Sequence, residues 1–191
     1  MSSNAEPAPK STAESYAVCV YCSASVTDPA ALELARAVGA EIGRRGWQLV
    51  SGGGHVSMMG AVATAARDAG ARTIGVIPKR LVHKEMADVE SDELIVTDTM
   101  RERKQVMDER ADAFLTLPGG IGTLEELFET WTGGYLGMHD KPVVVLDPDG
   151  HYGGLFTWLE ELRARGFAGD EAINRVTVTA DFDLAFTALE P

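Results

Sequence analysis

A short glycine-rich segment is the feature most suggestive of chemistry. Residues 117–123 read Leu-Pro-Gly-Gly-Ile-Gly-Thr and come directly after an apolar run. Glycines let a backbone approach a ligand closely, and the amides of a helix N-terminus favour an anion. The segment lacks both the G-x-G-x-x-G fingerprint and the Gly-Lys-Ser/Thr of a Walker A loop. It predicts a phosphate-binding turn in which Thr123 opens a helix, with a purely structural strand-to-helix turn as the alternative.

Glu126 lies just beyond this turn and has two interpretations. A carboxylate beside a phosphate-binding turn could act on a bound ligand. The spacing from Thr123 to Glu126 also fits a capping box, in which the glutamate satisfies a backbone N–H at the start of the helix. Spacing alone does not choose between the two.

Two further segments carry candidate ligand-binding residues. Residues 51–60 repeat the order of apolar run, glycines and helix, with Gly53 and Gly54 in the turn. His55 follows them, and a single histidine in a loop is more often solvated or structural than catalytic. Residues 100–110 are dense in Arg and Lys, which favours either a solvated helix face or contacts with phosphate and sugar hydroxyls.

Composition narrows the classes of function. The chain has 191 residues, a mass of 20.4 kDa and a net charge of −12, which argues for one globular domain and against a nucleic-acid surface. No run of 18 apolar residues is present, so no membrane span is expected.

Residues 1–15 are predicted to be a disordered tail without a secretory signal, and residues 16–191 are predicted to form one domain. The expected location is the cytoplasm.

Cys19 and Cys22 form a C-x-x-C pair, but they fall in a predicted strand. Residues three apart in a strand point to opposite faces, which disfavours zinc binding or dithiol chemistry. We expect buried free thiols in a reducing compartment. The remaining histidines show no metal-ligand spacing, so neither a metal nor a cofactor is predicted.

Strand-like and helix-like segments alternate from residue 16 onward. Nearly continuous apolar strands between amphipathic helices are typical of a parallel sheet covered on both faces. The predicted fold is therefore a Rossmann-like, doubly wound α/β sandwich. Strands are expected at residues 16–22, 47–51, 72–78, 93–97, 113–118, 143–147 and 175–179. In such sheets, ligands bind beyond the carboxyl ends of the strands, here at residues 22–25, 51–54 and 117–123.

An apolar stripe marks the helix after the glycine-rich turn. Leu124, Leu127, Phe128 and Trp131 have the spacing of one helix face. The stripe could pack on its own sheet, or it could be buried in a homodimer, which is the expected assembly.

Two motifs together resemble one known family. Residues 118–126 match the pattern PGGxGTxxE, and residues 100–104 match MxxRK. The pair is similar to the Lonely-guy (LOG) family of cytokinin riboside 5′-monophosphate phosphoribohydrolases, long labelled lysine decarboxylases. The resemblance extends over nearly all of the chain from residue 16. Ser57 departs from it, because it stands where the second glycine segment of the family has a further glycine.

The resemblance implies an activity and a set of site residues. The activity is hydrolysis of the N-glycosidic bond of adenine-type nucleoside 5′-monophosphates, AMP or prenylated AMP, to free base and ribose 5-phosphate. Arg103 and Glu126 match the catalytic pair, with Glu126 ionised in the first helical turn as nucleophile or electrostatic stabiliser. Substrate contacts are expected from Gly53, Gly54, Glu85, Lys104, Gly119, Gly120, Ile121, Gly122, Thr123, Leu124, Glu125 and Thr132.

Two other functions remain compatible with this sequence. One is a non-catalytic carrier of a nucleotide or of the molybdenum cofactor, which would have no need of the Arg103 and Glu126 pair. The other is a nucleosidase acting more broadly on purine monophosphates. A pyridoxal-phosphate decarboxylase is disfavoured, because the sequence shows no convincing Schiff-base lysine.

Overall fold

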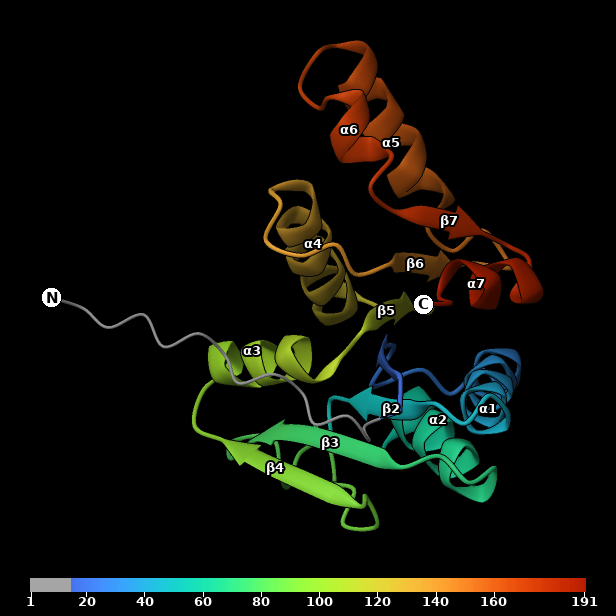
Figure 1. The fold of residues 1–191 in the computed structure, drawn as a ribbon, viewed down its shortest axis with the longest axis vertical. Helices are drawn as coiled ribbons and strands as arrows, with labels where there is room; N and C mark the ends of the chain where they lie inside the picture. The colour runs from blue at the N-terminus through green and yellow to red at the C-terminus, as the bar shows by residue number, and fades with distance from the viewer. Residues whose placement is uncertain (1–14) are drawn as a thin grey trace, which may run out of the picture.

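A single seven-stranded parallel sheet organises the chain (Figure 1). The computed structural model describes residues 15–191. The order of strands across the sheet is β4-β3-β2-β1-β5-β6-β7. The strands are β1 (Ala17–Tyr21), β2 (Gln48–Ser51), β3 (Thr73–Pro78), β4 (Glu93–Thr97), β5 (Ala113–Thr116), β6 (Val143–Leu146) and β7 (Thr177–Thr179).

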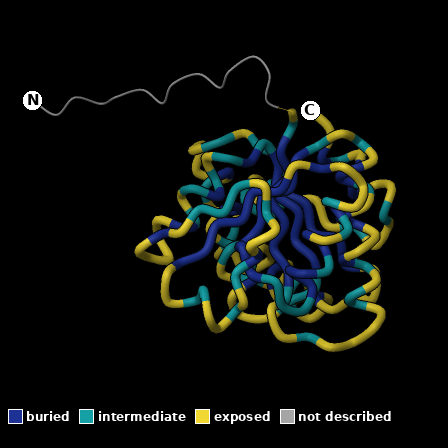
Figure 2. Tube along the Cα trace, turned by 90° about the horizontal axis from the view of Figure 1, so that it is seen from below, coloured by how far each residue is buried: buried dark blue, intermediate teal, exposed yellow. Residues whose placement is uncertain are grey.

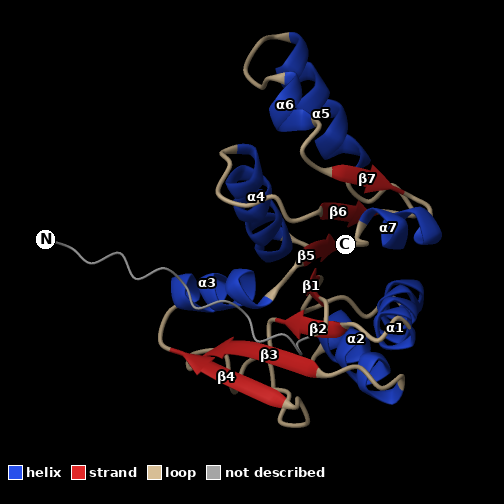
Figure 3. Ribbon diagram, viewed as in Figure 1, coloured by secondary structure: helices blue, strands red, loops and turns tan. Residues whose placement is uncertain are grey.

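Helices cover both faces of this sheet (Figure 3). One face is covered by α1 (Pro29–Arg44), α2 (Ser57–Asp68) and α7 (Phe182–Ala188). The other is covered by α3 (Met100–Arg110), α4 (Ile121–Tyr135), α5 (Gly153–Ala164) and the short α6 (Asp170–Ile173). The predicted doubly wound α/β fold is confirmed, although the sequence did not predict α6.

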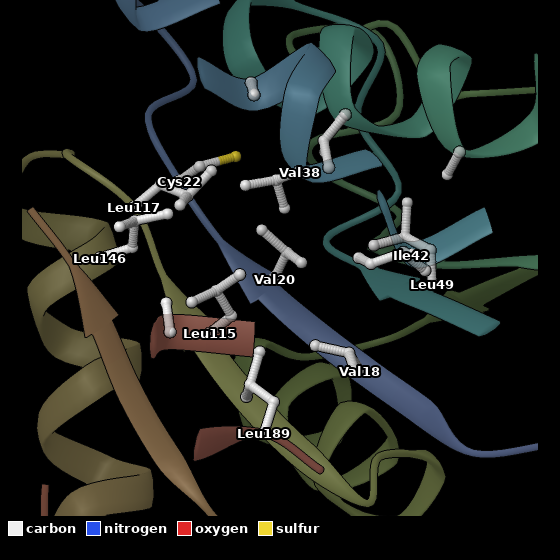
Figure 4. Close-up of a cluster of buried hydrophobic side chains, with 14 of the residues drawn as sticks. Val18, Val20, Cys22, Val38, Ile42, Leu49, Leu115, Leu117, Leu146 and Leu189 are labelled. Atoms are coloured by element: carbon white, nitrogen blue, oxygen red, sulfur yellow. The ribbon is translucent and has the colours of Figure 1, made fainter. Parts of the chain in front are cut away.

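The core is divided by the sheet into two apolar layers. Figure 4 shows the layer beneath α1, α2 and α7, where Val18, Val20 and Cys22 of one strand face meet Val38 and Ile42 of α1. The opposite layer holds Cys19 and the aromatic side chains packed under α3 and α4. In Figure 2 the central strands are the most deeply buried part of the chain. This two-sided burial explains why the strands are apolar at consecutive positions.

Both cysteines lie where the strand alternation predicted. Cys19 and Cys22 are buried, free, and assigned to opposite apolar layers. Burial raises the pKa of each thiol, which suppresses the thiolate form needed for metal binding or redox chemistry.

Small residues set the contact between α1 and α2. A Cβ atom at Gly39 would lie 2.2 Å from the carbonyl oxygen of Val62, and one at Gly43 would lie 2.5 Å from Cβ of Ala69. Asp28 begins α1 by accepting a hydrogen bond from the Ala31 amide. The loop after β1 leads into α1 and the loop after β2 leads into α2, so the contact between the two helices holds the ends of these loops together.

The order in which strands are added to the sheet changes direction at β1. Strands β2 to β4 are added on one side of β1, and β5 to β7 on the other. The loops after β1 and β5 therefore diverge from the same crevice, which is the usual ligand site of open parallel sheets.

The predicted start of α4 was wrong. The helix begins at Ile121 with Gly120 as its N-cap, so Thr123 neither opens nor caps it. Of the apolar stripe on this helix, Leu127 and Trp131 are almost fully buried on the chain's own sheet, and Leu124 and Phe128 are partly buried against the same layer.

The predicted tail, residues 1–15, lies outside the described residues except for Ser15. The carbonyl of Ser15 accepts a hydrogen bond of 2.7 Å from Nε2 of Gln48. Among the helices of residues 15–191, none has the length and apolarity that a bilayer crossing requires.

Candidate active site

A cleft of about 290 Å³ opens at the crevice between β1 and β5. Its walls come from five chain segments that are distant in sequence. The lining residues are Cys22, Ser23, Ala24, Ser25, Met59, Leu81, Glu85, Met100, Arg103, Gly120, Ile121, Gly122, Thr123, Glu125 and Glu126. The cleft thus brings together both recognised motifs and the loop after β1.

Arg103 is buried against the floor of the cleft and is only 5% exposed. Its Nε donates a hydrogen bond of 3.0 Å to the Val76 carbonyl, and its Nη2 donates one of 2.9 Å to the Gly52 carbonyl. A Cβ atom at Gly52 would lie 1.9 Å from Nη2, so only glycine leaves room for the guanidinium. Two backbone carbonyls therefore fix the orientation of this cation.

Two carboxylates face the fixed guanidinium from different elements. Nη1 of Arg103 lies 4.0 Å from Oε1 of Glu126, and Nη2 lies 3.8 Å from Oε2 of Glu85. The Glu85 oxygen is buried and has no hydrogen-bond partner among residues 15–191. A buried oxygen of this kind is available to a hydroxyl or amino group of a ligand.

The protonation of Glu126 differs from the expectation. Burial raises its pKa to about 7, against the opposing effect of Arg103, and the nearby Glu125 and Glu85 raise it further. Glu126 also lies in the second turn of α4, too far from the start to cap the helix, so the capping-box interpretation is wrong. The expected position of Glu126 in the first turn, where the helix dipole would favour its ionised form, is wrong for the same reason.

The turn before α4 presents backbone amides to the cleft. Gly120, Gly122 and Thr123 line it at the first turn of α4, where amide groups lack partners within the helix. A Cβ atom at Gly119 would lie 2.2 Å from Oγ1 of Thr123, so glycine is required for this tight entry. The 15-residue helix adds a favourable dipole for an anion here.

Two residues after β6 brace this turn. Tyr152 donates a hydrogen bond of 3.0 Å from its hydroxyl to the Leu117 carbonyl. Nε2 of His151 lies 2.9 Å from the Gly119 carbonyl oxygen. Sequence inspection did not identify either residue as part of the site, since they lie outside every recognised motif.

A second cleft of about 800 Å³ adjoins the first between α3 and α4. Glu125 and Glu126 line both clefts. Lys104 lies in the larger one and pairs with Glu125 and Glu129 of α4. Hydrogen bonds to these two carboxylates outweigh partial burial and raise the pKa of Lys104.

Some predicted contacts lie elsewhere. Leu124 packs on the core, and Thr132 is exposed and lines neither cleft. Gly53 and Gly54 are buried behind the cleft, where a Cβ atom at Gly54 would come within 3.1 Å of Glu85 Cβ. Gly54 packs against Glu85 and Gly53 against Val76 and Ile77, and neither glycine lines the cleft.

Residues 22–25 line the cleft, as the rule for strand ends predicted, but they were not included among the expected contacts. Met59, Leu81 and Met100 form an apolar part of the wall. Met59 and Met100 lie in segments that the sequence analysis singled out, but neither was among the expected contacts, and Leu81 lies in none of those segments. His55 is outside the cleft, with Nδ1 3.3 Å from Oδ1 of the buried Asp88. Within residues 15–191, no cluster of three or more His, Cys, Asp or Glu could hold a metal ion.

The sheet and the cleft define a Rossmann-like α/β protein with a glycine-rich turn beside an Arg–Glu pair. Solved structures with this fold include a molybdenum cofactor binding protein from Rippkaea orientalis, at a TM-score of 0.71 and 23% identity over 94% of this chain and 100% of that one. A molybdenum cofactor carrier protein from Chlamydomonas reinhardtii gives a TM-score of 0.68 and 24% identity, over 92% and 96% of the two chains. At such identities the likeness shows the fold alone.

Sequence relatives give the family. Residues 59–189 match the family model described as "Possible lysine decarboxylase". Proteins named cytokinin riboside 5′-monophosphate phosphoribohydrolase are 60% identical in Mycobacterium marinum and 57% in Mycobacterium tuberculosis, each over 92% of this chain and 94% of the relative. A relative of that name from Arabidopsis thaliana is 40% identical over 85% of this chain and 76% of its own length. The chain therefore belongs to the LOG family.

Proposed function

We propose that this protein hydrolyses the N-glycosidic bond of adenine-type nucleoside 5′-monophosphates. Water adds to C1′ of the ribose, the bond from C1′ to the base nitrogen breaks, and the base leaves with the bonding electron pair and takes up a proton. The products are free base and ribose 5-phosphate. The observation that carries the proposal is the pairing of a carbonyl-anchored Arg103 with Glu126, whose side chain is 13% exposed, directly beside the α4 turn.

The 5′-phosphate is proposed to bind at the turn before α4. The amides of residues 120–123 and the helix dipole supply hydrogen bonds and positive potential there. Holding the phosphate at this turn places the ribose over Arg103 and Glu126, which lie on the neighbouring wall. Such positioning converts the binding energy of a remote group into orientation at the reacting carbon.

Glu126 is proposed to act in its carboxylate form. Cleavage of the glycosidic bond develops positive charge on the sugar ring, which a negative group beneath C1′ stabilises or traps covalently. The low exposure of both side chains strengthens this interaction, because it is screened less than it would be in bulk water. Arg103 favours the carboxylate form, while Glu85 is placed to contact the sugar or the base from the opposite wall.

The residues of the cleft do not fit pyridoxal phosphate chemistry, despite the description of the family model. A Schiff-base lysine must lose its proton to attack an aldehyde. Lys104 is the lysine nearest to the motifs, and its two carboxylate partners raise its pKa. Among residues 15–191 no lysine lines the smaller cleft. We therefore assign no step to that cofactor.

The base is proposed to be adenine or an N6-prenylated adenine. Met59, Leu81 and Met100 offer apolar surface to a flat or prenylated base beside the sugar. The relatives named as phosphoribohydrolases of cytokinin riboside 5′-monophosphates support the prenylated substrate.

We also propose that the protein forms a homodimer in the cytoplasm. The apolar stripe of α4 is used internally, so the dimer must use other surface. Tyr135, Leu136 and Met138, at the end of α4, are 43%, 57% and 76% exposed and offer an apolar patch. Light scattering should give twice the chain mass at micromolar concentration, and a monomer mass would refute the dimer.

The buried free thiols are compatible with the proposed reducing compartment, the cytoplasm.

Identification of the reaction products tests the function. AMP, isopentenyladenosine monophosphate and the two matching ribosides are incubated with the protein, and the products are separated by chromatography. We expect free base and ribose 5-phosphate from the monophosphates and at least about 100-fold slower cleavage of the ribosides. Equal rates with and without the 5′-phosphate would contradict the proposed phosphate site.

A further inference from the structure

Ser57 has a backbone conformation that is unusual for a residue with a side chain. Its φ angle is +53°, and among the non-glycine residues of 15–191 only Met86 shares a positive φ. This left-handed region is unfavourable for L-residues other than glycine and, less strongly, Asn and Asp. A serine held there indicates that its side chain makes an interaction that a glycine would lose.

The side chain of Ser57 supplies such an interaction. Its hydroxyl donates a hydrogen bond of 2.6 Å to the carbonyl oxygen of Val26, 31 positions earlier in the chain. Ser57 is the first residue of α2, while Val26 lies in the loop between β1 and α1. The bond therefore joins the loops that leave two adjacent strands of the sheet.

The loop held by this bond is a wall of the cleft. Ser23, Ala24 and Ser25 line it opposite the α4 turn. Within the loop, Oγ of Ser23 accepts hydrogen bonds of 3.2 Å from the amides of Ser25 and Val26, so these residues form one compact turn. An anchor on the Val26 carbonyl thereby restrains the whole turn.

We propose that Ser57 is a positioning residue for nucleotide binding. Its hydroxyl fixes residues 23–26 at the distance from Gly120 that the phosphate and ribose require. Ser57 does not line the cleft itself, so its effect is exerted through the loop. The proposal rests on the proposed function, because the ligand it serves is the nucleoside monophosphate.

Two substitutions separate the hydrogen bond from the backbone strain. Ser57→Ala removes the bond and keeps the unfavourable conformation, whereas Ser57→Gly removes both. Hydrogen exchange of peptides covering residues 22–28 reports the loop directly. We expect exchange about five- to tenfold faster in both variants, the factor that corresponds to loss of one hydrogen bond. The glycine variant should melt at a higher temperature than the alanine variant, because glycine tolerates a positive φ.

Calorimetric binding of AMP links the loop to the site. The dissociation constant should rise by about the same five- to tenfold in both variants, with kcat at saturating AMP much less affected. Thr187→Ala is a matched control, because it removes a hydroxyl bonded to the Asp183 carbonyl in α7, away from the cleft. It should leave both exchange of residues 22–28 and AMP binding unchanged.

Unchanged loop exchange in either Ser57 variant would overturn the proposal. So would a loosened loop with unchanged AMP affinity, because the bond would then be structural only. A wild-type protein that binds AMP without hydrolysing it would refute the proposed function, while the exchange and binding results would still decide the role of Ser57.

Discussion

Nη1 of Arg103 lies 4.0 Å from Oε1 of Glu126, close enough for attraction but too far for a hydrogen bond. The other nitrogens of this guanidinium are held by the carbonyls of Val76 and Gly52. The pair is thus arranged without a direct bond, and each group keeps hydrogen-bonding capacity for a ligand. Hydroxyl groups of a ribose could engage both without displacing Arg103 from its backbone partners.

Turnover should depend on pH through Glu126. Burial raises its pKa to about 7, and the carboxylate is the proposed active form. Activity is therefore present above this pKa and lost as the pH falls through it. We expect kcat/KM for AMP, which reports groups of the free enzyme, to rise between pH 6 and pH 8 with a midpoint near pH 7. A rate that falls over this range would show that protonated Glu126 is required instead.

Glu126 should also lower the stability of the fold at alkaline pH. A carboxyl whose folded-state pKa is raised destabilises the native state when it is ionised, and the penalty disappears below its unfolded pKa of 4.5. Glu126→Gln should raise the free energy of unfolding at pH 8 by up to about 3 kcal/mol. Melting curves at pH 8 and pH 4.5 should show this gain shrinking at the lower pH. A loss of stability at pH 8 would contradict the buried, charged environment.

Gly52→Ala should disable the site without a change in any charged group. The new Cβ atom would lie 1.9 Å from Nη2 of Arg103 and must displace the guanidinium. Misplacement by about 1 Å can reduce turnover about 100-fold, so we expect a loss of that order in kcat for AMP.

Gly153→Ala is the matched control, since its Cβ atom would meet nothing within 4 Å. It should retain normal kinetics. Normal turnover in Gly52→Ala would show that the carbonyl anchoring of Arg103 is unimportant.

The predicted tail should be dispensable up to Ser15. A chain that begins at Ser15 keeps the hydrogen bond from Gln48 to the Ser15 carbonyl and should match the full chain in turnover and melting temperature. A chain that begins at Ala17 loses the bond from the Tyr16 hydroxyl to the Leu189 carbonyl and the ring contact with Trp47. It should melt several degrees lower. A large loss on removing residues 1–14 alone would refute the boundary.

The sheet could be predicted from sequence because its central strands are apolar at consecutive positions. Burial on both faces requires this pattern, and the strand at residues 17–21 is buried at every position. The cysteine interpretation succeeded for the same reason, since alternation in one strand placed Cys19 and Cys22 in different layers. The short helix α6 has no apolar periodicity and left no comparable signal.

The electrostatics of the site could not be predicted in this way. A capping box places Glu126 at a solvated helix start, whereas the actual start at Ile121 moves it one turn inward and buries it. The N-cap is thus Gly120 and not Thr123, three residues earlier, and burial of the Glu126 side chain raises its pKa to about 7. Packing between segments distant in sequence also placed Leu81, Tyr152 and His151, which no local pattern could reveal.

Glu126→Gln offers the most direct test of the proposed catalytic role. The variant keeps the shape of the side chain and removes the charge that the transition state is proposed to need. We measure AMP hydrolysis at saturation and AMP binding by calorimetry on the same preparation. The predicted result is a near-normal dissociation constant with kcat reduced at least about 100-fold. Near-normal turnover would contradict the assignment of Glu126 as the group that stabilises the transition state.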